Sequence, residues 1–108
     1  MKEELRRAIA VNAAARINNR NPAGVYSYDR GRHSSMSPNY DYETGAHIRG
    51  SGSGLYHYGV GNHVSLKVNG NSFSGYDYDG GHHFSGRVNG NSVQIYDYGE
   101  GSYFNYSV

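Results

Sequence analysis

The chain has no cysteine and no tryptophan, and only two of its 108 residues are proline. Without cysteine, disulfides, thiolate catalysis and cysteine-ligated zinc are all excluded. Aliphatic residues are scarce as well, because the apolar fraction is 36%, below the roughly 45–50% that is usual in soluble domains. Any hydrophobic core must therefore be built from few aliphatic side chains.

Long hydrophobic runs are also missing. The sequence contains no stretch of roughly 20 apolar residues, the length that a transmembrane helix needs. Residues 1–7 include two acids and no leucine-rich segment, which is not typical of a secretory signal. We therefore expect a cytoplasmic protein. The net charge of +1 selects neither nucleic acid nor an anionic membrane, so nucleic acid is not expected as a partner.

The abundant residues are glycine, with 16 copies, and tyrosine, with 12. Residues 63–82 and 83–102 form two copies of a 20-residue repeat, with Val-Asn-Gly-Asn-Ser and Tyr-Asp-Tyr in register. The Tyr-x-Tyr core also occurs upstream with shorter spacers. Its five copies begin at Tyr26, Tyr40, Tyr56, Tyr76 and Tyr96. After each copy come a glycine and then His33, His47, His63, His83 or Tyr103.

This repeat predicts β-hairpins. Asn-Gly is the strongest short hairpin signal, and a two-residue turn at Asn69-Gly70 pairs Leu66 with Phe73. The glycine-rich loop at the other end of the hairpin then pairs Tyr78 with His83. Side chains alternate between the two faces of a strand, so one face is predicted to be apolar. Its later members are Val64, Leu66, Val68, Phe73, Phe84, Val88, Val93, Ile95, Phe104, Tyr106 and Val108.

Residues 3–19 are predicted to form a helix. Its middle, residues 8–15, is apolar on every side except at Asn12, which is typical of a buried helix. We predict one mainly β domain over residues 1–108, in which residues 25–108 form a ten-stranded antiparallel meander of five Tyr-x-Tyr hairpins. The meander is expected to close, or nearly close, into a barrel around the helix, with the charged helix ends emerging at the two mouths. The alternative is an open curved sheet with the helix on its apolar face.

Five short hairpins around a hydrophobic centre resemble the β-flower proteins, and a helix through a barrel is similar to the Tubby-like fold. Both likenesses concern architecture and cover residues 25–108. The resemblance to the Tubby-like group implies lipid or membrane-surface binding. The 20-residue period with Tyr, Asp and Gly is also similar to the choline- and glucan-binding repeats of bacterial surface proteins, which carry tryptophan where this chain has none.

Two sets of residues are candidates for a site. The first is a ligand face of outward-pointing aromatic side chains: Tyr56, Tyr58, Tyr76, Tyr78, Tyr96, Tyr98, His63, His83 and Tyr103. The second is a rim of residues that each directly precede a Tyr of the loop: Asp41, His57, Asp77 and Asp97. We expect the rim side chains to accept hydrogen bonds from loop N–H groups; the alternative is a ring of carboxylates that attracts a cation.

No metal and no cofactor are expected. Equivalent histidines of successive hairpins lie two strands apart, roughly 9.6 Å, which is too far for them to share a zinc ion. No catalytic motif occurs, so the chain is expected to be a non-enzymatic binding or scaffold domain. The alternatives are a carbohydrate-binding module that uses its Tyr ladders, a lipid-binding domain, and a metal-dependent enzyme at the Asp/His rim. The partner is thus left open among carbohydrate, lipid and protein, and self-association is compatible with the repeats.

Overall fold

The computed structural model describes residues 1–108, apart from the side chain of Ser51. It contains one helix and eleven strands. Their bounds are α1 Glu3–Asn18, β1 Gly24–Ser27, β2 Arg32–Ser37, β3 Tyr40–Asp41, β4 Ala46–Ser51, β5 Gly54–His57, β6 Asn62–Ser65, β7 Lys67–Asn69, β8 Ser72–Asp77, β9 His82–Asn89, β10 Ser92–Asp97 and β11 Ser102–Ser107.

Ten of the strands form a closed antiparallel barrel, as the hairpin repeat predicted. The sheet order is β6-β5-β4-β3-β2-β1-β11-β10-β9-β8-β7. A bridge between Val64 of β6 and Asp77 of β8 closes the circle and leaves β7 outside it. The first hairpin meets the last through the pairing of Tyr26 with Ser107. The open-sheet alternative is therefore wrong.

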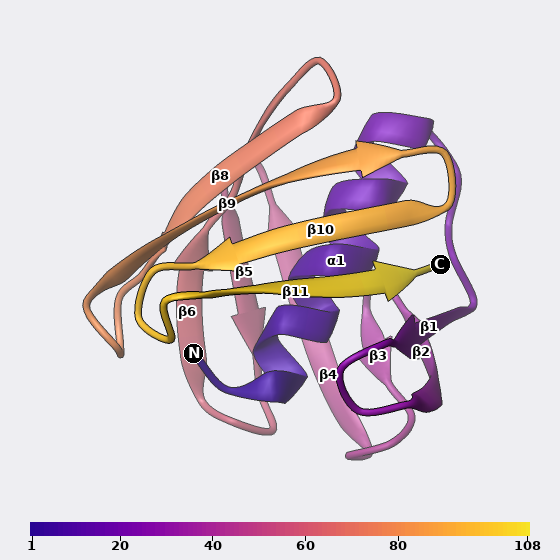
Figure 1. Ribbon diagram of the computed structural model, residues 1–108. Helices are drawn as coiled ribbons and strands as arrows, with labels where there is room; N and C mark the ends of the chain where they lie inside the picture. The colour runs from indigo at the N-terminus through magenta and orange to yellow at the C-terminus, as the bar shows by residue number, and fades with distance from the viewer.

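Helix α1 fills the barrel (Figure 1). The figure shows it enclosed between strands β8–β11, which run from salmon through orange to yellow, and the strands β4–β6. Its side chains from Ala8 to Val11 are all fully buried, as are Ala13 and Ala14. Sixteen helical residues span roughly 24 Å at 1.5 Å each, and the molecule measures 29 × 29 × 28 Å. The helix therefore crosses most of the molecule, and its small alanines let the strands surround it closely.

At the end of the barrel that carries the Tyr-x-Tyr loops, backbone hydrogen bonds link each hairpin to its neighbour. The second Tyr of each motif donates its N–H to the strand before it, for example Tyr78 to the carbonyl of His63 at 3.2 Å. The circle is completed by Tyr28, which donates to the carbonyl of Asn105 at 3.0 Å. The other donors are Tyr42, Tyr58 and Tyr98.

The predicted strand register is wrong by two residues. Phe73 pairs with Val68 instead of Leu66, and His83 pairs with Tyr76 instead of Tyr78. The turn consists of Gly70 and Asn71, and Gly70 has a φ of 62°, which fits a II′ turn with glycine in its first position. A shift by two residues keeps every side chain on its own face, so the division into an apolar and a polar face is confirmed.

Val68 is the exception to the predicted core. Its side chain is 37% exposed, because β7 runs past the end of β5 and lies outside the barrel. The junction just before it depends on Gly75, where an added Cβ would lie 1.9 Å from the carbonyl oxygen of Ser65. Glycine therefore allows β8 to approach β6 closely enough to close the barrel. Phe104 and Val108 are partly buried and pack against the core.

The first prediction concerns Ile9, which is fully buried on α1. The change Ile9→Asp puts an unpaired charge inside the barrel, at a cost of several kcal/mol against a total stability of about 5–15 kcal/mol. We expect loss of the cooperative unfolding transition in circular dichroism. Asn71→Asp is the control, because it adds the same charge at an exposed turn and should leave the transition in place. A folded protein after deletion of residues 1–20 would contradict the structural role of the helix.

Candidate functional site

The rim residues point into the barrel and hold its loops. Asp41, His57, Asp77 and Asp97 are all buried. Oδ1 of Asp77 accepts hydrogen bonds from the N–H groups of Asp79 at 3.1 Å and Gly80 at 3.2 Å. The same two bonds are accepted by Oδ1 of Asp41, Nδ1 of His57 and Oδ1 of Asp97 in their own loops. These side chains accept loop N–H groups as expected.

Two of the rim carboxylates also bind arginines of α1. Asp41 Oδ2 lies 3.4 Å from Arg7 Nη2, and Asp97 Oδ2 lies 3.1 Å from Arg6 Nη1. Arg7 is fully buried. The expectation that the charged helix ends emerge at the mouths is therefore wrong for Arg6 and Arg7, whereas Lys2 is exposed. These arginines stay inside because the inward-facing carboxylates neutralise them there.

The ion pairs extend outward from Asp41. Glu43 Oε2 lies 3.4 Å from Arg7 Nη1 and 2.9 Å from Arg30 Nη2. His57 Nε2 lies 3.0 Å from Asp41 Oδ2. Burial alone would raise the pKa of Asp41, but the hydrogen bonds from His57 and Thr44 and the charge of Arg7 outweigh it, so this pKa is lowered. The cations that the carboxylates bind at this mouth are therefore arginines of the chain's own helix α1.

The same balance applies to Glu43. Burial would raise the pKa of Glu43, but the hydrogen bond from Ser34 and the charges of Arg7 and Arg30 lower it overall. On the other side of the mouth, the hydroxyl of Tyr106 donates to Glu3 Oε2 at 3.1 Å, and burial raises the pKa of this phenol. Among the residues that the structure describes, no group of three or more His, Asp or Glu side chains could hold a metal ion.

The predicted ligand face lies on the outside of the barrel, but it is spread around the circumference. In each Tyr-x-Tyr motif the two rings meet edge to face with centroids 4.7–5.3 Å apart. Neighbouring strands add the pairs Tyr76–His83 at 4.8 Å and Tyr96–Tyr103 at 4.7 Å. His63 stacks on Tyr78 at 5.3 Å. The remaining candidates, Tyr56, Tyr58 and Tyr98, form such pairs on their own hairpins. The structure therefore does not bring the nine candidates together in one site.

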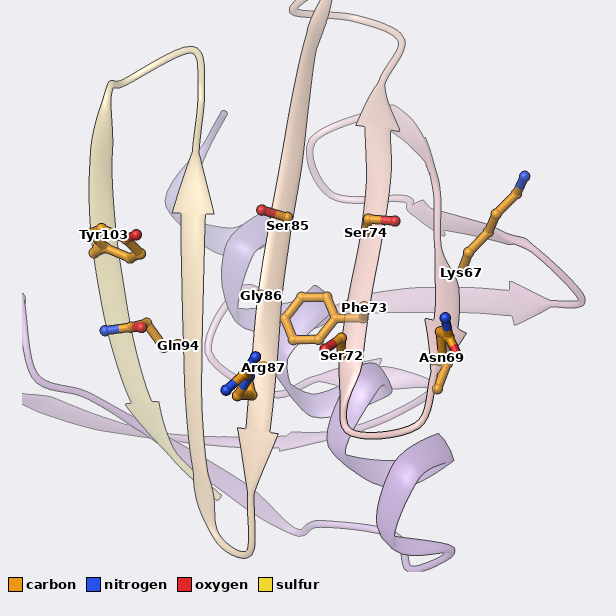
Figure 2. Close-up of a pocket in the computed structure, with 11 residues that line it drawn as sticks. Lys67, Asn69, Ser72, Phe73, Ser74, Ser85, Gly86, Arg87, Gln94 and Tyr103 are labelled. Carbon is orange, nitrogen blue, oxygen red and sulfur yellow. The ribbon is translucent and has the colours of Figure 1, made fainter.

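A groove of about 790 Å³ crosses the outer surface of β7–β11. Figure 2 shows Tyr103 and Gln94 at one side of it, Lys67 and Asn69 at the other, and Arg87 between them. Direct cross-strand pairs arrange its outward-facing side chains in two rows. The Arg87 row contains Asn69, Ser72, Arg87, Gln94 and Asn105. The Tyr96 row contains Lys67, Ser74, Ser85, Tyr96 and Tyr103.

Both rows cross five strands, roughly 19 Å at 4.8 Å per strand gap. A second hollow of about 330 Å³ adjoins the first, and Arg87 and Gln94 line both. Tyr28 lines the far side of this second hollow. The two hollows thus form one continuous surface, and the rings of Tyr103 and Tyr28, which are 59% and 62% exposed, both lie at its β11–β1 side.

Two Phe–Gly pairs join β8 and β9, and one of them, Phe73 with Gly86, lines the groove. Phe73 pairs with Gly86, and Gly75 pairs with Phe84, across β8 and β9. A Cβ added at Gly86 would lie 2.3 Å from Phe73 Cζ, and one at Gly75 would lie 2.5 Å from Phe84 Cζ. Each ring therefore covers the bare backbone of the facing strand. Glycines at such positions allow a ring or a neighbouring backbone to approach closely.

Sequence reasoning missed this groove. The alternation of side chains already places Lys67, Arg87 and Gln94 on the outer face, but repeated tyrosines are more conspicuous than single polar residues. The signal that could have found the groove is the length of the two 20-residue repeats, whose hairpins are longer than the upstream ones.

The chain was also compared with known proteins. No family model, no curated protein and no solved structure matches it. Within the described part of the chain, no helix combines the length and the hydropathy that a membrane span requires.

A prediction follows from the two roles of the rim carboxylates. Asp41→Asn keeps an oxygen for the loop but removes one of the two carboxylates that lie 3.4 Å from the buried Arg7, which should cost about 1.5–3 kcal/mol of stability. Asp77→Asn is the matched control, because Asp77 holds its loop in the same way and takes part in no salt bridge among the described residues. It should cost about 1 kcal/mol. Urea unfolding of both variants tests this, and equal losses would contradict the role of the Arg7 pair.

A second prediction concerns acid. The folded pKa values of Asp41 and Glu43 lie below their ordinary values of 3.8 and 4.5, so the unfolded state takes up these protons first. The stabilisation from the two groups is complete above the ordinary values and is lost as pH falls from about 4.5 through the folded values. Urea unfolding between about pH 6 and pH 3 should show this slope, and Glu43→Gln should make it shallower. An unchanged slope in Glu43→Gln would contradict the assignment.

Proposed function

We propose that this chain is a non-enzymatic binding domain whose ligand lies in the groove across β7–β11. The observation that carries the proposal is a hollow of about 790 Å³ lined by two ordered rows of hydrogen-bonding side chains. This volume is within the range of about 300–1,000 Å³ that is common for ligand sites. The barrel interior is taken up by α1, so the outer surface is where a ligand has room.

The ionisable groups at the loop mouth support a role without catalysis. A general acid or base works best with a pKa near the working pH. Asp41 and Glu43 instead have lowered pKa values because they pair with arginines. These carboxylates hold loops and helix together, and they do not line the groove.

Carbohydrate is the ligand class that fits the groove best. Its lining offers the hydroxyls of three serines, the amides of Asn69 and Gln94, and the ring of Tyr103. Such groups can donate and accept hydrogen bonds with the many hydroxyls of a sugar, and an amphipathic Tyr ring can pack on a sugar face. Val68 and Phe73 are the apolar side chains in this lining besides the Tyr103 ring, and Phe73 is buried, so most of the side chains that a ligand meets here are polar. The groove therefore favours the lectin-like alternative over lipid binding.

Binding to soluble oligosaccharides tests this function. Titration calorimetry with malto-, cello-, chito- and galacturonate oligosaccharides should give measurable affinity for at least one of them. For that ligand, Tyr103→Ala should weaken binding about tenfold, which corresponds to about 1.4 kcal/mol. Tyr42→Ala is the matched control, because Tyr42 is 62% exposed on a hairpin outside the groove. Equal effects of the two changes, or no binding of any of the four, would refute the proposal.

A further inference from the structure

Two cations line the groove without an acidic partner. Lys67 on β7 and Arg87 on β9 are both exposed. Neither takes part in a salt bridge or a side-chain hydrogen bond to any other residue that the structure describes. The arginines at the loop mouth differ from them, since Arg6, Arg7 and Arg30 each pair with one or more carboxylates. The donors of Lys67 and Arg87 are therefore available to a ligand.

The acids of this half of the chain lie elsewhere. Residues 50–108 contain four of them, Asp77, Asp79, Asp97 and Glu100. Asp77 and Asp97 are buried under the loops that they hold, and Asp79 and Glu100 lie within those loops. None of the four lines the groove. The first hollow is thus lined by two cations and no acid, while Asp29 lies beside the second hollow, where its Oδ2 accepts the N–H of Asn105 at 3.1 Å. A positive cleft concentrates anionic ligands.

Each cation lies among neutral hydrogen-bonding side chains. Arg87 is flanked in its row by Ser72 and Gln94, and Gln94 is itself fixed by a 3.1 Å hydrogen bond from its Nε2 to Asn105 Oδ1. Lys67 is followed in the other row by Ser74 and Ser85. Arg87 lines both hollows, so it stands at the centre of the combined surface. A guanidinium offers a planar fork of donors that matches a carboxylate.

We infer that the groove binds an acidic oligosaccharide, one whose sugars carry carboxylates, as uronic acids do. Arg87 pairs with one carboxylate, Lys67 with a second, and the serines and amides of the two rows bind hydroxyls between them. The rings of Tyr103 and Tyr28 pack against sugar faces at the β11 side, opposite Lys67. This inference rests on the proposed function, and adds the charge of the ligand and the two residues that select it.

The number and arrangement of the cations favour an acidic glycan over other polyanions. Single-stranded nucleic acid needs a basic groove that follows its backbone, and here two cations are separated by hydroxyls and amides. An acidic peptide would need apolar contacts for its other side chains, whereas most of the exposed side chains that line the groove are polar. Two separate charges among many hydrogen-bonding groups instead fit a ligand in which hydroxyls lie between successive carboxylates.

The experiment compares two forms of one ligand. Oligogalacturonate is titrated into the protein beside the same oligosaccharide after reduction of its carboxylates to hydroxymethyl groups. The two share their linkage and nearly all of their hydroxyls, and they differ in charge. We expect oligogalacturonate to bind at least tenfold more tightly at low salt. The difference should shrink as ionic strength rises, because salt screens exposed charges.

Variants then locate the selectivity. Arg87→Gln should lower the affinity for oligogalacturonate about tenfold, while the affinity for the reduced form stays nearly unchanged. Lys67→Gln should act in the same direction with a smaller effect, since a lysine offers no fork. Arg87→Lys keeps the charge and should recover part of the preference. Arg49→Gln is the control, because Arg49 is exposed on β4, outside the groove. Circular dichroism confirms that each variant is folded.

The outcomes separate the inference from the function on which it rests. Equal affinity for the acidic and the reduced oligosaccharide overturns the inference and leaves the proposed function standing. If neither form binds, and no neutral oligosaccharide binds either, the inference and the proposed function are both overturned. Oligodeoxythymidylate and poly-glutamate are titrated in parallel, and tighter binding of either one than of oligogalacturonate overturns the inference in favour of that polymer. A preference that survives in both Arg87→Gln and Lys67→Gln overturns the assignment of these residues.

Discussion

The side chain that directly precedes a loop at the mouth of the barrel connects that loop to the barrel interior, and in two cases to helix α1. Asp41, His57, Asp77 and Asp97 face inward and accept the N–H groups of their own loops, so each loop closes over the mouth of the barrel. The inward carboxylates place negative charge in that mouth, and Arg6 and Arg7 neutralise it. Acids are the residues that normally favour the start of a helix. Here the arginines of its first turns lie at the loop end because the carboxylates are there, which sets the direction in which α1 crosses the barrel.

Much of the fold could be predicted from the sequence, because side-chain alternation and the repeat both constrain it. The register could not. The sequence Val-Asn-Gly-Asn-Ser contains both Asn-Gly and Gly-Asn, and turns at either place leave every side chain on the same face, so the hydrophobic pattern does not distinguish them. The exposure of Val68 also depends on something outside its own hairpin, since it lies beyond the end of β5. The burial of Arg7 could be predicted only by considering the positions of the helix and of the rim carboxylates together.

The groove could likewise be predicted only in part from the sequence. Alternation assigns Arg87 and Gln94 to the outer face, but whether an outer face is convex or hollowed depends on how far the sheet bends. Phe73 covers Gly86 and Phe84 covers Gly75, and these contacts exist only once β8 and β9 are paired. The tyrosines, by contrast, were placed on the correct face. They largely contact one another and neighbouring histidines along each hairpin, which supports a role for many of them in the stiffness of the surface.

Closure of the barrel also limits how the gene could evolve. In an open array of repeats, one more copy lengthens the array and leaves the others unchanged. In this chain the first hairpin is paired with the last, so a duplicated hairpin would have to enter the circle and add two strands to it. The diameter of a barrel grows with its number of strands, and an alanine-rich helix of fixed width would then leave empty space around it. Tandem duplication, the mechanism by which repeat proteins usually expand, is therefore opposed here by the packing of α1, and the number of hairpins is tied to the thickness of one helix.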